Sequence, residues 1–547
     1  MSLRPQPVNA VPEETARVAH AIYPKGNIYM RMRDELGTFF CDADFADMFP
    51  DQGQPALAPW RLALVTVMQF VENLSDRQAA EAVRDRISWK YALGLEIADQ
   101  GFNFSVLSEF RDRLLQGNAE HRLLDLMLAQ LKEKGLLKVR GRMRTDATHV
   151  LAHMRVMRRL EMVGETLRAT LNALAVAAPE WLKPQITSDW FERYSRRIED
   201  TRFPTSQEGR LALAETYGRD GIHLLQAVYS PDAPAWLRDV PMVETMRQVW
   251  LHHFVIMDEK ICWRDAKDTP PSLQRLDSPY ETEARYGNKR TVTWIGYRVH
   301  LTETWDEGLP HLIVNAEISP ASPPDHLTTL QIHNSLEAKA LLPDEHLVDS
   351  GYVTAEHLAD CETRFGVDLM GPIHPNTNWQ SRANTGFDGR QFVVDWEREQ
   401  VTCPEGKVSS KWRTAIDPHG KPVVRAHFSK RDCRPCPKRA LCTKATVKGR
   451  CITMRPVAHQ QAMERARQRE NTDEFKQIYA QRAGVEGTIS QSVRRLDLRH
   501  CRYRGAAKSH LQHIATAAAM NIFRLDDWLS GVEPAKTRIS HFARLAS

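Results

Sequence analysis

The sequence predicts an α/β core that is interrupted by two inserts and preceded by a helical domain. Apolar residues recur at helical spacing over 60–115, whereas 138–150 alternates with a period of two, as a strand does. Two further strand patterns appear only at 292–304 and 311–319. A crossover helix and the short buried strand "HLVDSGY" follow them. Strands and helices that alternate in this way favour an α/β layer architecture.

Length and composition restrict the class of protein. The chain has 547 residues, which predicts two to four domains, and its 42% hydrophobic and 26% charged residues are typical of globular proteins. No apolar run could cross a bilayer, and "MSLRPQPVNAVPEETARV" has no signal-peptide core, so we expect a cytoplasmic protein without a membrane partner. Nine cysteines, an odd number, fit a reducing compartment better than a disulfide framework.

The helical domain has recognisable start signals. Ser75 and Gln78 form a capping-box pattern that begins one helix, whose buried face holds Ala79 and Val83. Ser105 is the expected N-cap of the next helix.

Changes of pattern along the chain set the expected domain boundaries. We expect a flexible arm over 1–25 and a helical DNA-binding or dimerisation domain over 26–130. The core should combine 131–150, 285–350 and 467–528, and its closing helices are predicted over 474–496 and 508–525. The remaining segments are a mostly helical insert over 151–284, a Cys-rich insert over 351–466 and a tail over 529–547.

Three acidic residues stand where an α/β protein builds sites. Asp146 and Asp349 end strand patterns, and Glu486 lies on a predicted helix. Carboxylates at strand ends converge at the carboxyl edge of a sheet. Three hard oxygen donors suit Mg²⁺ or Mn²⁺. The chain holds no Gly-rich phosphate loop and no HExxH motif, so we expect no nucleotide cofactor.

The surroundings of Glu486 strengthen this prediction. Tyr479, Arg482 and Glu486 are spaced i, i+3, i+7 and would share one face of a single helix. Gly484 and Gly487 each cost that helix about 1 kcal/mol relative to alanine. They indicate close approach of a backbone, a phosphate or a DNA strand, or else a kink or tight helix–sheet packing.

Tyr479-x-x-Arg482-x-x-x-Glu486 resembles the Tyr-Arg-Glu signature of bacterial insertion-sequence transposases of the DDE type. "RTDATHV" and "EHLVDSGYV" are similar to the segments that carry their first and second aspartates. "SPYETEARYGNKRTVTWIGYRVHLTET" resembles the second-strand region of one such group, and "SDRQAAEAVRDRISWKYALGL…FNFSVLSEFRDRLL" resembles an InsH-like N-terminal domain. The resemblance implies an RNase H-like core, with Asp146, Asp349 and Glu486 as its catalytic, metal-binding triad.

The same resemblance implies an activity. The protein would cut DNA at the ends of an insertion sequence and join the 3′-hydroxyl ends to target DNA by two-metal phosphoryl transfer. Its partners would be the terminal inverted repeats, target DNA and a second copy of the chain, and when bound to DNA it would be nucleoid-associated. The family pattern has lysine seven residues after the glutamate, where this chain has Val493. An inactive, element-derived DNA-binding protein and a metal-dependent nuclease without strand transfer therefore stay open as alternatives.

The cysteines of the second insert form a separate candidate site. Cys403, Cys433, Cys436 and Cys442 have the spacing C-x29-C-x2-C-x5-C, which is a reasonable tetrahedral set for structural Zn²⁺. An iron–sulfur cluster and free thiols are the alternatives, and Cys451 could replace one of the four.

A basic run follows Glu486. Six positive charges stand there against the single carboxylate of Asp497, a density that suits a phosphodiester backbone and predicts salt-sensitive binding. By the resemblance, Tyr479 and Arg482 would position the scissile strand. The basic residues expected to hold the backbone are Arg494, Arg495, Arg499, Arg502, Arg504 and Lys508.

Overall fold

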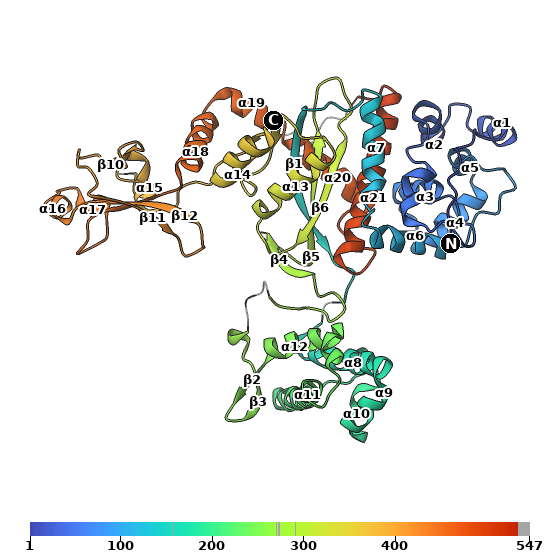
Figure 1. Cartoon of the computed structure of the whole chain (residues 1–547), viewed down its shortest axis with the longest axis horizontal. Helices are drawn as coiled ribbons and strands as arrows, with labels where there is room; N and C mark the ends of the chain where they lie inside the picture. The colour runs from blue at the N-terminus through green and yellow to red at the C-terminus, as the bar shows by residue number, and fades with distance from the viewer. Residues whose placement is uncertain (156, 270, 272–273, 290, 385, 534–547) are drawn as a thin grey trace, which may run out of the picture.

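The computed structural model describes residues 1–155, 157–269, 271, 274–289, 291–384 and 386–533 (Figure 1). The predicted tail over 529–547 therefore lies mostly outside the described residues. A search of the described part of the chain found no helix with the length and apolar character needed to span a bilayer.

The N-terminal domain is helical, as predicted. Ser75 and Gln78 do form a capping box at the start of α4. Helix α6 begins at Ser105 itself, and the side chain of Asn103 accepts the Ser105 amide hydrogen, so Ser105 is not the N-cap. The helices are α1 (Glu13–Ile22), α2 (Ile28–Arg31), η1 (Met32–Leu36), η2 (Asp42–Met48), α3 (Pro59–Val71), α4 (Asp76–Asp85), α5 (Ile87–Leu93), α6 (Ser105–Gln116) and α7 (Arg122–Glu133).

The prediction of a flexible arm over 1–25 was wrong. Ala19 on α1 is fully buried with Met30 and Tyr91, which hold this helix against the domain. The hydroxyl of Thr15 donates to the carbonyl of Leu95 at 2.8 Å. A short helix with a narrow apolar face gives a weak sequence signal, and its partners lie far along the chain.

The core is a mixed six-stranded sheet. β5 pairs antiparallel with β1 along one edge and with β4 and then β6 along the other, whereas β7 and β8 continue the sheet parallel to β1. The strands are β1 (Arg142–Leu151), β4 (Arg285–Lys289), β5 (Val292–Thr304), β6 (Ile313–Pro320), β7 (Glu345–Leu347) and β8 (Asp368–Met370).

Strand β8 corrects a predicted boundary, because it belongs to the core although it lies inside the expected insert over 351–466. Its three residues are too few for a period to be recognised. α14 contacts both β8 and α18, so the Cys-rich module is attached through core helices. The helices around the sheet are α13 (His326–Ala338), α14 (Ala355–Asp360), η7 (Cys361–Phe365), α18 (Val457–Glu470), α19 (Asp473–Ala480), α20 (Ala483–Leu496) and α21 (Ala506–Leu529).

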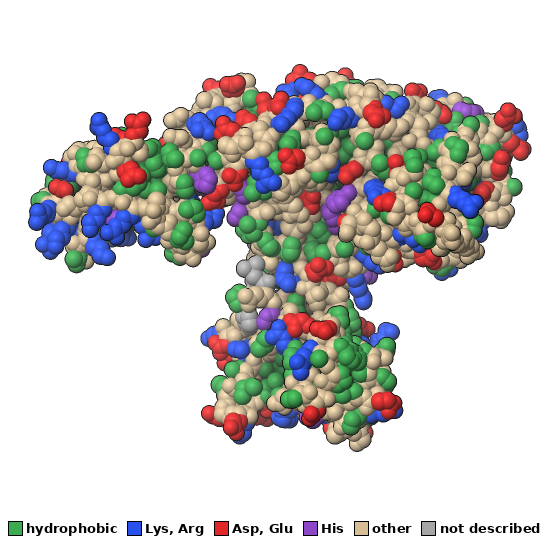
Figure 2. Space-filling model, viewed as in Figure 1, with side chains coloured by type: hydrophobic (Ala, Val, Ile, Leu, Met, Phe, Trp, Pro, Cys, Tyr) green, Lys and Arg blue, Asp and Glu red, His purple; other side chains and the backbone are tan. Residues whose placement is uncertain are grey.

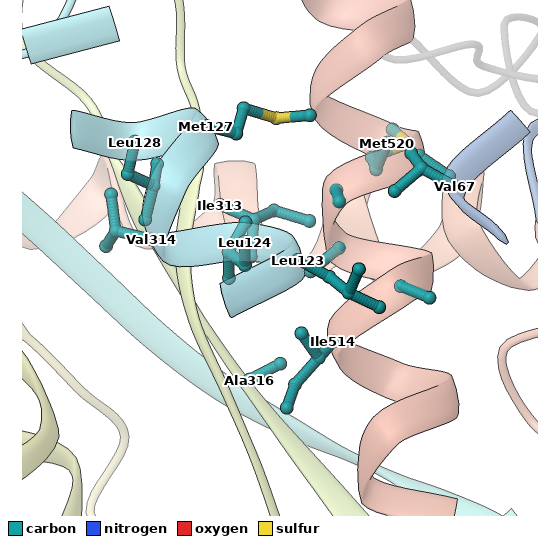
Figure 3. Close-up of a cluster of buried hydrophobic side chains, with 14 of the residues drawn as sticks. Val67, Leu123, Leu124, Met127, Leu128, Ile313, Val314, Ala316, Ile514 and Met520 are labelled. Atoms are coloured by element: carbon teal, nitrogen blue, oxygen red, sulfur yellow. The ribbon is translucent and has the colours of Figure 1, made fainter. Parts of the chain in front are cut away.

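The sheet and the N-terminal domain share one apolar core. Figure 3 shows its centre, where Leu124 of α7 and Ile514 of α21 lie beside Ile313 and Ala316 of β6. α21 also packs against α3, so the last helix of the chain joins the first domain to the sheet. Burial of this kind contributes about 25 cal/mol per Å² of apolar surface, and it fixes the two parts relative to each other.

The first insert is mostly helical, as expected, and has its own core around Leu167, Trp250 and Leu237. In Figure 1 it projects from the end of the sheet as a separate body. Its elements are α8 (Arg159–Ala177), α9 (Pro179–Leu182), η3 (Lys183–Gln185), α10 (Ser188–Tyr194), η4 (Ile198–Asp200), α11 (Gln207–Val228), η5 (Ala235–Asp239), α12 (Pro241–His253), β2 (Phe254–Met257), β3 (Lys260–Trp263) and η6 (Ala266–Asp268).

The Cys-rich module is small and rich in strands. Three strands form its central antiparallel sheet in the order β11-β12-β13, with a separate β9-β10 pair beside it. Phe392, Val401 and Phe428 form its apolar centre. The elements are α15 (Trp379–Ala383), η8 (Gly389–Gln391), β9 (Val393–Asp395), β10 (Gln400–Thr402), β11 (Lys411–Ile416), β12 (Pro422–His427), α16 (Lys430–Cys433), α17 (Arg439–Cys442) and β13 (Cys451–Met454).

Candidate functional site

Asp146 and Glu486 meet at one arginine. The guanidinium of Arg482 donates to Asp146 Oδ2 at 3.1 Å and to Glu486 Oε1 at 2.6 Å. Asp146 lies mid-strand on β1, and its side chain is 13% exposed, whereas that of Glu486 on α20 is 58% exposed. Two carboxylates that are 340 positions apart by their residue numbers thus share one cation.

Asp349 lies in the loop after β7, near Asp146, but in the described structure Asp146, Asp349 and Glu486 do not form a group whose ligand atoms all lie within 4.8 Å of one another. Asp349 Oδ1 accepts the amide hydrogen of Gly351 at 2.8 Å, which holds the carboxylate in a tight turn. Burial raises the pKa of Asp146, Arg482 lowers it, and the like charge of Asp349 raises it further. Asp349 therefore lies close enough to Asp146 for the two charges to repel each other.

The geometry of Tyr479, Arg482 and Glu486 differs from the prediction. The expected single helix over 474–496 is interrupted at residues 481–482, so Tyr479 lies in the last turn of α19, whereas Arg482 is the N-cap of α20. The three side chains remain neighbours, because the Arg482 guanidinium lies 5.8 Å from the centre of the Tyr479 ring. Tyr479 in turn stacks on Phe475, with ring centres 5.4 Å apart.

A buried ion-pair network holds the start of α20 against the sheet. Glu303 of β5 is fully buried and accepts from Arg144 Nε at 2.6 Å, Arg524 Nη1 at 2.7 Å and Thr488 Oγ1 at 2.5 Å. The Arg144 guanidinium also donates to the carbonyl of Gln481 at 2.5 Å, in the break between α19 and α20. This network therefore sets the position from which Arg482 and Glu486 reach Asp146.

The two glycines beside Glu486 have different environments. A Cβ at Gly484 would collide with the guanidinium of Arg144, which Glu303 and Gln481 already hold. A Cβ at Gly487 meets nothing within 4 Å. Close helix–sheet packing therefore explains Gly484, whereas no described residue lies close enough to require a glycine at Gly487.

We expect these glycines to respond in opposite ways to alanine. Gly484→Ala should destabilise the fold by about 1–3 kcal/mol through overpacking. Gly487→Ala should leave the stability unchanged or raise it by up to about 1 kcal/mol, because alanine favours the helix. Thermal unfolding of the two variants beside the parent chain measures this. Equal destabilisation by both would contradict the packing argument.

The predicted cysteine set surrounds one pocket. Cys403, Cys433, Cys436 and Cys442 all line a cavity of about 250 Å³ in the Cys-rich module. Burial raises the pKa of Cys442, and the other three thiols are close enough to raise it further. Cys451 is not among the residues that line this cavity, and its sulfur lies 3.9 Å from His427 Nε2.

The predicted DNA-binding arginines divide into two groups. Arg502 is not available to DNA in this structure, since it donates to the carbonyl of Leu74 at 2.9 Å and covers the Phe70 ring. Lys508 forms an ion pair with Asp112 of α6 at 2.8 Å. Both attach the helical domain to the core instead of presenting free charge.

Among the described residues, the other members of the basic run form no hydrogen bond or ion pair with the helical domain. Arg494, Arg495 and Arg504 are exposed, and Arg494 donates to the hydroxyl of Ser490 at 2.6 Å. Arg499 Nε donates to Thr148 on β1 at 3.1 Å. Val493 stands at the position of the family lysine. Its side chain is partly buried and packs against the main core, so this part of α20 contributes to the core.

Sequence reasoning missed a second basic surface. Figure 2 shows Lys and Arg side chains gathered on the Cys-rich module, over β11, α16 and α17. The many lysines and arginines around the cysteines in "SKRDCRPCPKRALCTKATVKGR" could have indicated this surface from the sequence. The exposed members are Lys407, Lys411, Arg413, Lys430, Arg431, Arg434, Lys438, Lys444 and Lys448.

Acids beside a mixed sheet, a helical domain and an exposed basic surface are features that nucleic-acid-processing proteins combine. Two family models agree: one described as "Transposase DDE domain" matches residues 402–526, and one described as "Transposase domain (DUF772)" matches residues 17–113. Together they support an insertion-sequence transposase of the DDE type. The first match contains Glu486 and the cysteine set, while Asp146 and Asp349 lie outside both. Searches of curated proteins and of solved structures returned no significant match.

Proposed function

We propose that this chain cuts DNA at the ends of an insertion sequence and joins the freed 3′-hydroxyl ends to target DNA. The convergence of Asp146 and Glu486 on Arg482, with Asp349 beside them, is the observation that carries this proposal. The matches of this chain to two transposase models support the same proposal. A sheet whose β1 lies between an antiparallel and a parallel neighbour supports an RNase H-like core.

The acidic group fits divalent metal ions. Its donors are carboxylate oxygens, which Mg²⁺ and Mn²⁺ prefer. The ion pairs of Arg482 with Asp146 and Glu486 support the proposal that positive charge is favourable between these two acids. Two bound ions would activate the attacking oxygen and stabilise the leaving one. The carboxylates of Asp146, Asp349 and Glu486 would hold these ions, and Glu486, whose side chain is exposed, would be free to reorient toward them.

Arg482 and Tyr479 have roles next to the acids. Arg482 is a permanent cation that lies between Asp146 and Glu486, so it can hold a phosphate once its ion pairs with these carboxylates are exchanged. Tyr479 supports the guanidinium from the end of α19 and keeps it directed toward Asp146. Both residues thereby position the scissile strand.

We infer that DNA also binds the basic surface of the Cys-rich module. Replacing Lys411, Arg413 and Lys430 by glutamine should weaken binding and reduce the slope of log affinity against log salt by about 3, since each lost phosphate contact removes about 0.9. Fluorescence anisotropy of a labelled duplex over a salt series measures this. The matched control replaces exposed Arg196, Arg197 and Arg202 of the helical insert and should leave the slope unchanged.

The cysteine set is proposed to hold a structural Zn²⁺. The four thiols line one cavity in a module with a small apolar centre. In the described structure no three of their sulfur atoms lie within 4.8 Å of one another, so they would have to move together to close around the ion. Elemental analysis should find about one zinc more in the parent chain than in the variant with Cys433→Ser and Cys436→Ser. Cys262→Ser, in the first insert, is the control. Iron instead of zinc, or no metal, would refute the zinc assignment.

The proposed reaction is tested with an oligonucleotide that carries the end of the element, taken from the DNA flanking the gene. Metal-dependent cleavage distinguishes the enzyme from an inactive DNA-binding protein. Joining of the cut end to a second duplex distinguishes a transposase from a nuclease. Because two ends are processed together, we expect a homodimer on DNA, and light scattering of the complex should give two chains per paired ends.

A further inference from the structure

A group of two histidines and a glutamate lies at the junction of the helical domain and the core, away from the acidic site. Glu120 and His121 immediately precede α7, and His510 stands in the first turns of α21. Their ligand atoms all lie within 4.8 Å of one another. In the described ranges of the chain, this is the sole group of three His, Cys, Asp or Glu residues that does so.

One carboxylate oxygen is shared by the two rings. Glu120 Oε1 lies 3.9 Å from His121 Nε2 and 4.0 Å from His510 Nδ1. The second ring nitrogen of His510, Nε2, lies 3.0 Å from the carbonyl oxygen of Ala316 on β6. A neutral imidazole that donates Nε2–H to this carbonyl keeps the lone pair of Nδ1 directed toward Glu120. Metal-bound histidines are commonly oriented by such a hydrogen bond.

One carboxylate oxygen of Glu120, Oε2, is buried and has no hydrogen-bond partner among the residues that the structure describes. The whole Glu120 side chain is 15% exposed. An unsatisfied buried oxygen costs about 1–3 kcal/mol, which a bound cation would offset. The His121 side chain is 39% exposed, so one side of the group remains open to a water molecule.

The ligands stand on a rigid frame. Leu123 and Leu124, which follow His121, and Ile514, one turn after His510, belong to the buried cluster drawn in Figure 3. Ala316, whose carbonyl orients His510, lies in the same cluster. Because these neighbours are packed, the three side chains are held near one another before any ion binds.

We propose that Glu120, His121 and His510 bind one divalent ion of the Zn²⁺ class, with water as a fourth ligand. Two imidazole nitrogens and one carboxylate favour Zn²⁺ or Co²⁺ over Mg²⁺, which prefers oxygen ligands alone. The ion would join the connection between α6 and α7 to α21 and thereby strengthen the attachment of the helical domain. This proposal is independent of the DNA reaction.

Cobalt binding to the full chain tests the site. The protein is freed of metal with a chelator, transferred into excess Mg²⁺ and titrated with Co²⁺. Co²⁺ bound to cysteine thiolates gives charge-transfer absorption bands, so binding at the cysteines is measured separately from binding at the histidines. We expect His121→Asn with His510→Asn to bind one Co²⁺ fewer than the parent chain while its thiolate bands stay unchanged. His223→Asn, on α11 of the first insert, should bind as the parent does.

A conservative variant guards against misfolding. Glu120→Gln keeps the shape of the side chain, and we expect it to weaken Co²⁺ binding by about tenfold or more while the unfolding temperature in chelator stays that of the parent. Zn²⁺ should raise the unfolding temperature of the parent by more than that of Glu120→Gln. Equal Co²⁺ stoichiometry and affinity in the parent and both ligand variants would overturn the proposal.

Discussion

Asp349→Ala should abolish both cleavage and joining of an element-end oligonucleotide while DNA binding persists. A metal ion supplies several kcal/mol of charge stabilisation, and about 4 kcal/mol corresponds to roughly a thousandfold in rate. We therefore expect both rates to fall by about a thousandfold or more. Binding should persist because the exposed lysines and arginines of the Cys-rich module are untouched.

Asp344→Ala is the matched control for this prediction. Asp344 is exposed and lies at the opposite end of β7, where only its backbone makes hydrogen bonds, to Gly141 and Asp368. Its removal should change neither cleavage nor joining. Gel-based cleavage and strand-transfer assays at saturating Mg²⁺ measure both variants. Cleavage retained by Asp349→Ala would show that the triad is assigned wrongly.

Glu303→Gln should destabilise the core and impair the reaction together. Glu303 is fully buried between Arg144 and Arg524, so neutralising it leaves two arginines without their common counter-charge. Removing one partner of a buried ion pair costs about 3–5 kcal/mol. Cleavage should also fall, because Arg144 then loses the partner that holds it at Gln481, beside Arg482.

The stability difference between the parent chain and Glu303→Gln should depend on pH in a defined direction. Burial raises the pKa of Glu303, but Arg524 and Arg144 outweigh it and hold the pKa below its usual range. The pair therefore contributes stability above the unfolded-state pKa, and this contribution is lost as the pH falls through the folded-state value. The unfolding temperatures of the parent and Glu303→Gln should accordingly converge as the pH is lowered.

An exposed ion pair serves as the comparison. Glu362 and Arg465 lie 2.7 Å apart with side chains 61% and 59% exposed. Glu362→Gln should cost less than about 1 kcal/mol and leave cleavage unchanged, because water screens such pairs. Thermal unfolding over a pH series measures both variants. A Glu303→Gln chain that is as stable as Glu362→Gln would show that the network does not hold α20.

Elements with strong local periodicity could be predicted from the sequence. The strand over 292–304 has the predicted bounds, and the capping box at Ser75 begins its helix as expected. Strand β8 and helix α1 were missed, because a three-residue strand carries no period and the burial of α1 depends on Met30 and Tyr91. Short elements such as these are stabilised by contacts with residues that are distant in the sequence.

The same division holds for the candidate site. The order and spacing of Asp146, Asp349 and Glu486 were sufficient to identify three acids and their resemblance to a family. The spacing of these residues could not reveal the break at 481–482. Two helices joined by a turn keep Tyr479, Arg482 and Glu486 close together, just as a single helix would. Nor could the spacing show that Arg502 and Lys508 hold the helical domain.

The sequence by itself determined which residue types are present, their local periodicity and the order of the acids. Tertiary structure alone decided that Arg144 fills the space beside Gly484, that Arg482 bridges Asp146 and Glu486, and that Glu120, His121 and His510 meet. The physical reason is that these contacts join residues hundreds of positions apart. Only the packing of strands and helices around a common core brings such residues within a few ångströms.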